Sequence, residues 1–357
     1  MNTAIVIKAA TQFIGNGSDI SVEPIGSGLI HQTYKAKKGK DDHAVVLQAI
    51  NTNVFRSAED IMSNYALLYE FLQHQHNGNK IPAPIITDDG NLIWKDAANN
   101  NWRATEFISD SFSPLIANNE EAAYTVAKSF AAFTKSLSEL DINSLKEIIP
   151  NFHNLSFRFK QFEDSIKSAS QERLLKSTHV IAELRQRKKL VDFFEHVQHS
   201  KEYPTRVMHH DCKISNILFD KNSGKVICPV DLDTVMPGKF FSDLGDMIRS
   251  MACTVDENSI EWEKIDIRPS FYKAILNGYV EGIGDIFTSE EKKNIHYAGL
   301  ILIYMQSLRF ITDYLNNDIY YKITYNEQNL SRAMNQLILL EKLEEFLKTE
   351  YSFTPSN

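Results

Sequence analysis

The sequence feature that most constrains the fold is a polar stretch followed by a short hairpin, between residues 206 and 233. The apolar pair Val207 and Met208 comes first, then the polar run 209–216, and then two short apolar runs separated by the turn 221–224. Glycine in such a turn permits a positive φ, so we expect the two runs to fold back on one another. Polar side chains gather at the open end of this predicted hairpin, where we expect the functional site.

Three oxygen-bearing side chains, Asp211, Asn216 and Asp231, lie at that open end. Mg²⁺ prefers oxygen ligands and binds proteins through one or two side chains plus waters and substrate phosphates. Phosphoryl transfer needs such a metal-held nucleotide and a group that orients the acceptor hydroxyl. We therefore predict Asn216 and Asp231 as Mg²⁺ ligands, Asp211 as the group that acts on the hydroxyl, and Lys213 as a cation that offsets charge on the moving phosphoryl group.

The pattern His209-x-Asp211-x4-Asn216, with Asp231 after an apolar strand, resembles the catalytic and metal-binding loops of the protein-kinase-like fold. The resemblance is closest to the aminoglycoside and choline phosphotransferase branch. Within that branch, the segment DLDTVMPG, residues 231–238, is similar to the N-acetylhexosamine 1-kinase group.

This resemblance implies an α+β, bilobal architecture with a small β-rich N-terminal lobe, residues 1–108, and a larger helical C-terminal lobe, residues 109–357. It further implies an ATP- and Mg²⁺-dependent small-molecule kinase, whose acceptor is the anomeric hydroxyl of an N-acetylhexosamine. The partners would then be ATP and a sugar or other alcohol.

The resemblance also implies positions for the nucleotide. Gly26 and Gly28 stand between two strand-like runs and would form the lid over ATP, although a plain hairpin turn is the simpler interpretation of that segment alone. Gln48 occupies the strand position where the fold usually carries a lysine, which removes a positive charge. The segment from Glu106 to Ile108 would be the hinge whose backbone reads adenine.

For the acceptor, the resemblance implies Arg309 and Tyr320, in a segment similar to the one that contacts sugar in N-acetylhexosamine 1-kinases. A surface ion pair between Arg309 and Asp313, four residues apart on a helix, explains this segment equally well. His31 is a further candidate for facing the substrate, with a half-exposed strand histidine as the alternative.

Two residues are expected to support the loop. By the resemblance, Asp243 is a buried brace that accepts hydrogen bonds from the catalytic loop, with His209 as its partner. A general-base role for His209 is the less favoured alternative, because Asp211 matches the acceptor position of the motif.

Composition excludes several classes of protein. The 357-residue chain carries a net charge of −8, whereas a nucleic-acid binder normally has a basic surface. Cys212, Cys228 and Cys253 contain no CxxC pair and fit a reducing, cytoplasmic environment. The longest apolar run, 298–305, falls short of the roughly 20 residues of a membrane span. The sequence leaves the oligomeric state undetermined.

Helical periodicity predicts a helix over 57–73, two helices within 162–197, and a helix through 298–315 that opens at a Thr288 capping box.

Three other functions remain open. The first is a kinase for choline, an amino alcohol or an aminoglycoside, which an acidic and aromatic acceptor site would favour. The second is a ligand-binding pseudokinase, which Gln48 favours and the intact Asp211 and Asp231 oppose. The third is a cysteine hydrolase using Cys212 or Cys253, although no oxyanion-forming motif accompanies either residue.

Overall fold

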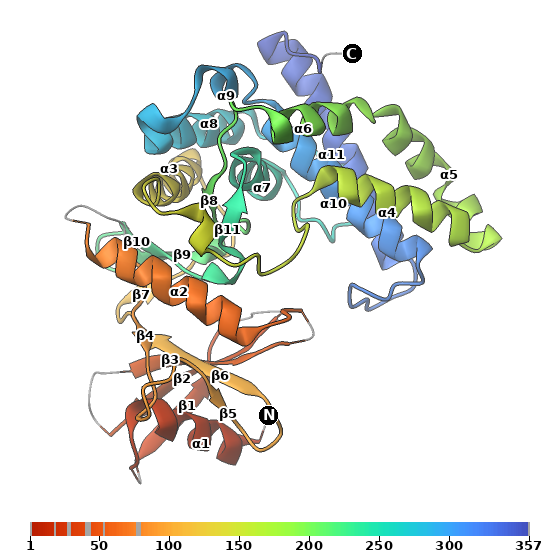
Figure 1. The fold of residues 1–357 in the computed structure, drawn as a ribbon. Coiled ribbons are helices and arrows are strands. Elements are labelled where there is room, and N and C mark those ends of the chain that lie inside the picture. Colours follow the sequence, from red (N-terminus) through yellow and green to blue (C-terminus); the bar gives the residue numbers. More distant parts are fainter. Residues whose placement is uncertain are drawn as a thin grey trace. The chain divides into compact units, whose positions relative to one another are not determined.

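The computed structural model describes residues 2–17, 19–26, 30–39, 44–52, 54–75 and 80–355. The chain forms two compact units (Figure 1). The sheet unit comprises Met1–Ser113, Glu139–Pro150 and Ile217–Met236. The helical unit comprises Pro114–Ser138, Asn151–Asn216 and Pro237–Asn357.

The described part of the sheet unit contains an antiparallel sheet with the strand order β1-β2-β3-β6-β4, and β5 also pairs with β6. The strands are β1 (Ile20–Pro24), β2 (Gln32–Lys38), β3 (Ala44–Ile50), β4 (Pro84–Ile85), β5 (Trp94–Lys95) and β6 (Asn101–Glu106). The register places Thr33 opposite Gln48 and Gln48 opposite Arg103. Opposed residues point to the same face of a sheet, so these three side chains form a row across three strands.

Two helices cover apolar surface in the sheet unit. Helix α1 (Thr3–Ile14) buries Val6 and Phe13 in a cluster with Leu47 and Trp102. Helix α2 (Ala58–Gln73) confirms the predicted helix: the Ser57 side chain caps it, and its apolar residues at helical spacing are buried.

The predicted hairpin is present as β9 (Ile217–Asp220) and β10 (Val226–Pro229), which pair antiparallel. Strand β7 (Ser111–Phe112), which follows β6 in the chain, pairs antiparallel with β9. The hairpin and β7 thus form a three-stranded sheet. Residues 139–150 and 217–236 therefore belong to the sheet unit. The pairing of β7 with β9 connects the second segment to it. The Asn64 side chain contacts both segments, because it donates to the Lys146 and Val235 carbonyls. A single division at residue 108 therefore does not describe how the chain packs.

The helical unit is built from helices and one short strand pair. The helices are α3 (Glu120–Ser136), α4 (Leu155–Ser168), α5 (Gln171–Gln186), α6 (Lys189–His199), α7 (Phe241–Met251), α8 (Pro269–Ile283), α9 (Ser289–Lys293), α10 (Tyr297–Leu315) and α11 (Gln328–Tyr351). Strand β8 (Arg206–Met208) pairs with β11 (Met236–Gly238). Helix α10 is buried along nearly its whole length, and α7 and α11 both pack on it.

Two predictions about helices were wrong. Residues 155–199 form three helices because Ser170 caps a separate α5 and a turn at Arg187 ends it. The Thr288 capping box exists, but it opens only the short α9, which ends at Asn294 before α10 begins. No described helix combines the length and the apolar character that a membrane crossing requires.

Candidate active site

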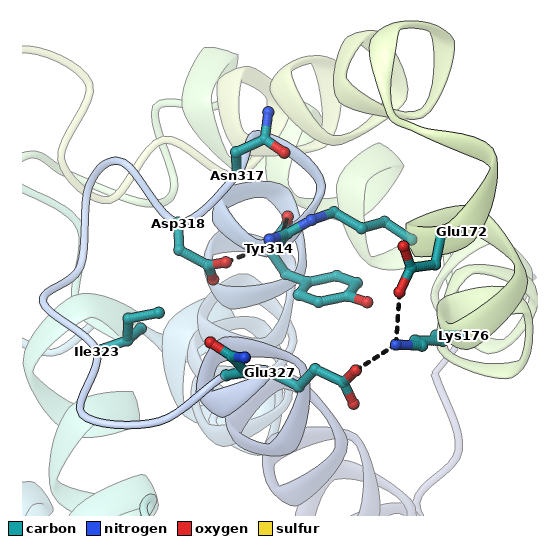
Figure 2. A pocket seen from close by; sticks show the side chains of 9 residues that line it. Glu172, Lys176, Tyr314, Asn317, Asp318, Ile323 and Glu327 are labelled. Atoms are coloured by element: carbon teal, nitrogen blue, oxygen red, sulfur yellow. Dashed lines mark hydrogen bonds and ion pairs between the residues drawn. The ribbon is translucent and has the colours of Figure 1, made fainter.

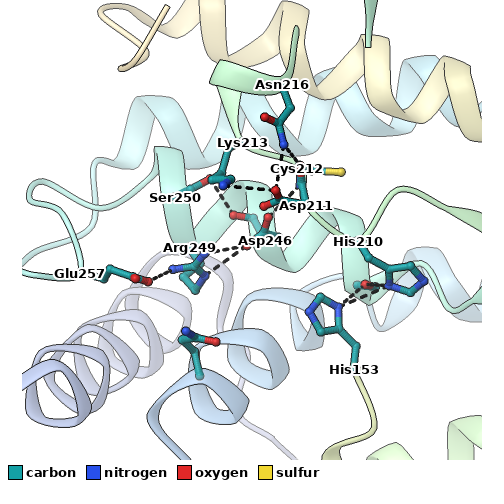
Figure 3. A network of polar contacts seen from close by, with 12 residues as sticks. His153, His210, Asp211, Cys212, Lys213, Asn216, Asp246, Arg249, Ser250 and Glu257 are labelled. Carbon is teal, nitrogen blue, oxygen red and sulfur yellow. Dashed lines mark hydrogen bonds and ion pairs between the residues drawn. The ribbon is translucent and has the colours of Figure 1, made fainter. Parts of the chain in front are cut away.

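The predicted catalytic loop follows β8 and is held by two buried carboxylates of α7. Asp243 accepts the backbone N–H of His209 at 2.9 Å and that of His210 at 2.8 Å. Asp246 accepts the N–H of Cys212 at 2.8 Å. Both aspartates are almost inaccessible to solvent, and their i,i+3 spacing puts them on one face of the helix. The loop backbone is therefore fixed by side chains, of which Figure 3 shows Asp246 beside Cys212.

Two of the predicted functional side chains of the loop, Asn216 and Lys213, lie beside Asp211. The Asn216 Nδ2 donates to the backbone oxygen and to Oδ2 of Asp211, both at 2.9 Å. The Lys213 Nζ lies 3.2 Å from Asp211 Oδ2. The Asp211 side chain is 26% exposed, so a ligand can reach its carboxylate. Since Asn216 uses its amide nitrogen on Asp211, its amide oxygen is the atom suited to a cation.

His209 lies in a different environment from its neighbours. The residue is fully buried, and its imidazole packs in T-shaped contacts with the Phe130 and Phe133 rings. Its Nδ1 lies 3.4 Å from the backbone N of Asp211. A ring enclosed in this way is suited to support and cannot reach an acceptor hydroxyl.

A charged network that we did not predict extends from the loop along α7. The Arg249 guanidinium binds Asp246 at 2.8 Å and Glu257 at 2.7 Å, and Glu257 also pairs with Arg332. Burial raises the pKa of Asp246 despite the neighbouring Arg249, and the negative charge of Asp211 adds to the rise. Only the i,i+3 relation of Asp243 and Asp246 signals this network in the sequence, because Glu257 and Arg332 join it through the tertiary fold.

A second unpredicted group joins the other side of the loop. The Ser242 Oγ lies 2.6 Å from His210 Nδ1 and 2.5 Å from His153 Nδ1. Burial lowers the pKa of His153 well below its usual value, and the nearby His210 adds to this, so His153 is neutral. His210 takes the left-handed conformation, with φ of 66°, and its ring fills the space where a side chain at Gly238 would project.

In the sheet unit, Asp231 follows β10 and also takes the left-handed conformation, with φ of 60°. Asp231 is exposed, whereas Asp233, two residues later, is 2% exposed. The Arg103 guanidinium binds both Asp233 oxygens, at 2.5 and 2.9 Å. Burial acts to raise the pKa of Asp233, but Arg103 and the His31 hydrogen bond overcome it and hold the pKa well below its usual value. Asp233 is thus a buried, ionised brace beside the predicted metal ligand.

Gln48, which we predicted to stand at the usual lysine position, belongs to this brace. Its Oε1 accepts from Arg103 Nε at 2.9 Å, and its Nε2 donates to Thr33 Oγ1 at 3.2 Å. Both ends of the amide are therefore used inside the sheet. The positive charge of this region belongs to Arg103, which is 3% exposed and is neutralised by Asp233.

His31 completes the brace. The backbone N–H of Asn51 donates to His31 Nδ1 at 3.1 Å, which requires Nδ1 to accept. The proton of the neutral ring is therefore on Nε2, which lies 2.6 Å from Asp233 Oδ2. With both nitrogens engaged and the Phe55 ring stacked on it, His31 is placed to position Asp233 and not to bind an acceptor.

The predicted hinge residues are also engaged with protein. Glu106 ends β6, and its carboxylate and backbone N–H both bond Ala83. The Ile108 carbonyl accepts from Ser111 Oγ at 2.6 Å. Gly26 has a φ of 74°, which suits a turn, and Gly28 lies outside the described residues. The assignment of these residues to the nucleotide stays a prediction.

The structure does not form the ion pair that we considered between Arg309 and Asp313. Asp313 is buried and accepts the N–H groups of Tyr320 and Tyr321, at 2.8 and 2.9 Å. Arg309 instead donates to Gln306 and lies against the Phe152 and Tyr321 rings. Asp313 therefore shapes the 318–321 loop, on which Tyr320 is 63% exposed.

Comparison with known proteins identifies the kind of enzyme. Residues 21–283 match the model of the phosphotransferase enzyme family. The chain belongs to this family. The predicted phosphotransferase and kinase class is thereby confirmed.

Solved structures resemble the phosphotransferase over nearly all of its length. An aminopropanol kinase associated with a microcompartment is 14% identical, with 98% of each chain covered and a TM-score of 0.63. The choline kinase of Cryptosporidium parvum is 15% identical, with 99% of this chain and 98% of that one covered and a TM-score of 0.60. A spectinomycin phosphotransferase solved with ADP and spectinomycin is 14% identical, with 95% and 98% covered and a TM-score of 0.59. These likenesses confirm the protein-kinase-like, α+β fold.

The phosphotransferase also has a hollow of about 350 Å³ in the helical unit, far along the sequence from the catalytic loop (Figure 2). Its cations are paired: Arg173 binds Asp318 at 2.7 Å, and Lys176 binds Glu172 and Glu327. These ion pairs connect α5 to the segment between α10 and α11. The charged residues that line the hollow therefore have a structural role.

The donor atoms of the phosphotransferase suit Mg²⁺. In the described parts of the chain, no group of three His, Cys, Asp or Glu residues is arranged to hold a metal. The predicted set is different, since it uses the Asn216 amide oxygen, the exposed Asp231 carboxylate and nucleotide oxygens. Asn216 belongs to the helical unit and Asp231 to the sheet unit, so their meeting at one ion stays a prediction.

The three cysteines are unsuited to nucleophilic chemistry. Cys212, Cys228 and Cys253 are all buried and free. Burial raises the pKa of each thiol, that of Cys228 to about 12, which disfavours the thiolate. This opposes the hydrolase alternative.

Proposed function

We propose that this phosphotransferase moves the γ-phosphoryl group of ATP, with Mg²⁺, to the anomeric hydroxyl of an N-acetylhexosamine. One observation carries the proposal. A reachable Asp211 carboxylate lies within bonding distance of both Asn216 and Lys213, on a loop whose backbone is held by Asp243 and Asp246. This is the arrangement that phosphoryl transfer by positioning and electrostatics needs.

In the reaction, the acceptor oxygen forms a bond to the γ-phosphorus, and the bond from that phosphorus to the β,γ-bridging oxygen breaks. Asp211 orients the hydroxyl and takes its proton late, and ADP leaves with the bonding electron pair. Lys213 offsets the negative charge on the transferred group. When bound by Asn216 and Asp231, Mg²⁺ supplies charge neutralisation at the phosphate oxygens.

The choice of a hexosamine rests on the resemblance of the segment around Arg309 and Tyr320. The main alternative is an amino alcohol or aminoglycoside, because the solved relatives include aminopropanol and choline kinases and a spectinomycin phosphotransferase. A pseudokinase is less favoured. Gln48, the feature in its favour, has a structural use beside Arg103, and Asp211 and Asp231 are both present.

The test is a screen of ATP consumption with free sugars, N-acetylhexosamines, choline, amino alcohols and aminoglycosides, each with and without Mg²⁺. We expect the largest Mg²⁺-dependent rate with an N-acetylhexosamine, and a product spectrum with phosphorus coupled to the anomeric position. The Asp211→Asn variant is the matched control. A preferred amine substrate, or a phosphate on another hydroxyl, would contradict the hexosamine assignment.

A further inference from the structure

His210, the residue before Asp211, has a backbone conformation that is uncommon for residues other than glycine. Its φ of 66° lies in the left-handed region, where the Cβ atom crowds the following carbonyl oxygen. Among the described non-glycine residues with a positive φ, only His210 is buried. Such a conformation is unfavourable and persists only where the surrounding structure holds it, so the contacts of His210 indicate what it serves.

Two consecutive residues at the start of α7 bind both the backbone and the ring of His210. The Asp243 Oδ1 accepts the backbone N–H of His210 at 2.8 Å. The Ser242 Oγ lies 2.6 Å from the His210 Nδ1. Both α7 residues are buried, so water does not compete for these bonds. One helix turn therefore fixes the residue from which the chain continues into Asp211.

A second imidazole, that of His153, shares the Ser242 hydroxyl (Figure 3). The His153 Nδ1 lies 2.5 Å from Ser242 Oγ and 3.5 Å from His210 Nδ1. Since the hydroxyl carries a single hydrogen, it can donate to only one ring and must accept a hydrogen bond from the other. The Phe152 ring stacks on His153, with ring centres 4.4 Å apart. The three polar residues thus form one hydrogen-bonded unit, the His153–Ser242–His210 clamp.

Gly238 of β11 leaves the space that the His210 ring occupies. A Cβ atom at position 238 would lie 2.5 Å from Cε1 and 2.9 Å from Nε2 of that ring, well inside ordinary van der Waals contact. The φ of Gly238 is not positive, so the glycine serves space and not backbone conformation. The His210 residue is 5% exposed in this setting, so its ring is unsuited to touching a ligand and acts through the chain.

We propose that His210 is a positioning residue, whose clamped ring and left-handed backbone set the direction in which the Asp211 carboxylate meets the acceptor hydroxyl. The physical basis is preorganisation. Phosphoryl transfer relies on positioning, and a displacement of about 1 Å at a reacting group can cost roughly 100-fold in rate. This inference rests on the proposed phosphotransfer, to which it adds a residue that never touches substrate.

The first test replaces His210 by glycine. Glycine accepts a positive φ without strain and removes the ring, so His210→Gly should fold while Asp211 is held less firmly. The kcat is measured with ATP, Mg²⁺ and the acceptor that gives the largest rate in the screen above. We expect kcat to fall by roughly tenfold or more, with the KM for ATP nearly unchanged. A role in stability alone would leave kcat unchanged at a temperature where circular dichroism shows the variant folded.

His210→Asn is the matched rescue variant. Asparagine tolerates the left-handed region, and its amide can place a polar atom near the position of the His210 Nδ1, within reach of Ser242. Its kcat should therefore stay close to that of wild type. His199→Ala removes an exposed imidazole at the end of α6 and should change neither kcat nor KM. The proposal is overturned if His210→Gly keeps the wild-type kcat, or if His210→Asn loses as much as His210→Gly.

A double-mutant cycle tests whether the His210 ring and the Ser242 hydroxyl act together. Ser242→Ala removes the shared hydroxyl and should also lower kcat. Because both substitutions break the same link, the double variant His210→Gly, Ser242→Ala should lose no more than the more damaging single variant. Losses in kcat that multiply would show that the two residues act separately, which contradicts a clamp.

Hydrogen exchange separates this inference from the proposed function. The Asp211 and Cys212 amides should exchange faster in His210→Gly than in wild type, whichever acceptor the enzyme uses. If no acceptor is phosphorylated but these amides lose protection, the proposed function fails while the positioning role of His210 stands. If phosphate is transferred and neither kcat nor exchange responds to His210→Gly, the positioning role fails while the proposed function stands.

Discussion

Each of the two units has an accessible candidate aspartate near a buried aspartate, but the buried aspartates are held by different partners. In each unit a reachable carboxylate, Asp211 or Asp231, lies near a buried carboxylate that organises the backbone or turn around it. In the helical unit, Asp243 is bound by two backbone N–H groups. In the sheet unit, Asp233 is bound by a buried arginine and a histidine.

The two braces should differ in how much stability a single substitution removes. Amide groups are neutral, so losing their acceptor leaves only unpaired dipoles. Losing one member of a buried ion pair leaves a full charge in a medium that solvates it poorly. The sheet unit should therefore be the more sensitive of the two to single substitutions in its brace, and less sensitive to mild acid.

The largest effect should come from the reachable aspartates themselves. Asp211→Asn should lower kcat by roughly 10²–10⁴-fold while nucleotide binding persists, because it removes the group that receives the proton. Asp231→Asn should instead weaken Mg²⁺-dependent nucleotide binding. Steady-state kinetics and calorimetric titration of nucleotide with Mg²⁺ separate the two outcomes. Near-normal turnover in Asp211→Asn would remove that residue from the mechanism.

The next largest effect should be on stability in the sheet unit. Asp233→Ala leaves Arg103 buried without a counter-charge, and we expect a loss of about 3–5 kcal/mol in the free energy of unfolding. The double variant Arg103→Met, Asp233→Leu should lose much less, since no charge remains buried. Urea denaturation of the three proteins measures this. Equal losses in the single and double variants would show that packing, not charge, sustains the brace.

A smaller loss is expected in the brace of the helical unit. Asp243→Asn keeps one acceptor oxygen and leaves one loop N–H unsatisfied, which should cost about 1–3 kcal/mol. The catalytic loop should become more mobile, so kcat should fall while the affinity for nucleotide changes little. Hydrogen exchange of the His209 and His210 amides reports the loosening. If this variant is destabilised more than Asp233→Ala, the contrast between the two braces is wrong.

The smallest effect concerns mild acid. Burial lowers the pKa of His296 to about 4 from 6.5, and His153 is shifted in the same direction. Below pH 6.5 these histidines therefore bind protons in the unfolded chain but remain neutral in the folded helical unit. Each histidine then lowers the free energy of unfolding by at most about 1.4 kcal/mol for each pH unit of acidification. The pKa of Asp233 is lowered, so its contribution is lost only below the usual aspartate pKa.

Hydrogen exchange measured by segment between pH 7 and pH 5, corrected for intrinsic rates, should thus show the helical unit opening more readily while the Asp233 brace is unaffected. His296→Phe should remove part of the slope. A uniform loss of protection in both units would contradict this distinction.

The sequence predicted the part of the site that is local along the chain. The hairpin β9–β10 follows from two apolar runs and the turn chemistry between them, over a short distance along the chain. The helices with a clear apolar face were predicted for the same reason. The contact of Asp243 with the loop was implied by the family resemblance and not by spacing. Helix ends set by a single cap, such as Ser170, were missed because a cap competes only weakly with periodicity.

The role of Gln48 illustrates what spacing cannot give. From the sequence, we predicted that Gln48 replaces the usual lysine and so removes a positive charge. In the fold it is one member of a row formed with Thr33 and Arg103, and that row ends on Asp233, far along the chain. His31 is a similar case. We predicted that it faces the substrate, whereas in the structure it contacts Asp233 and the backbone of Asn51, partners that are distant in sequence.

The sequence by itself determined that this chain carries a phosphotransferase loop followed by a hairpin, since those groups lie within one short segment and backbone geometry brings them together. Only the tertiary structure decided which charges are neutralised. Arg103 meets Asp233 across the sheet, whereas Arg158 and Arg309 lie near each other with no acidic partner among the described residues. Electrostatic energy depends on distance in space, and residue order does not encode that distance for partners brought together by folding.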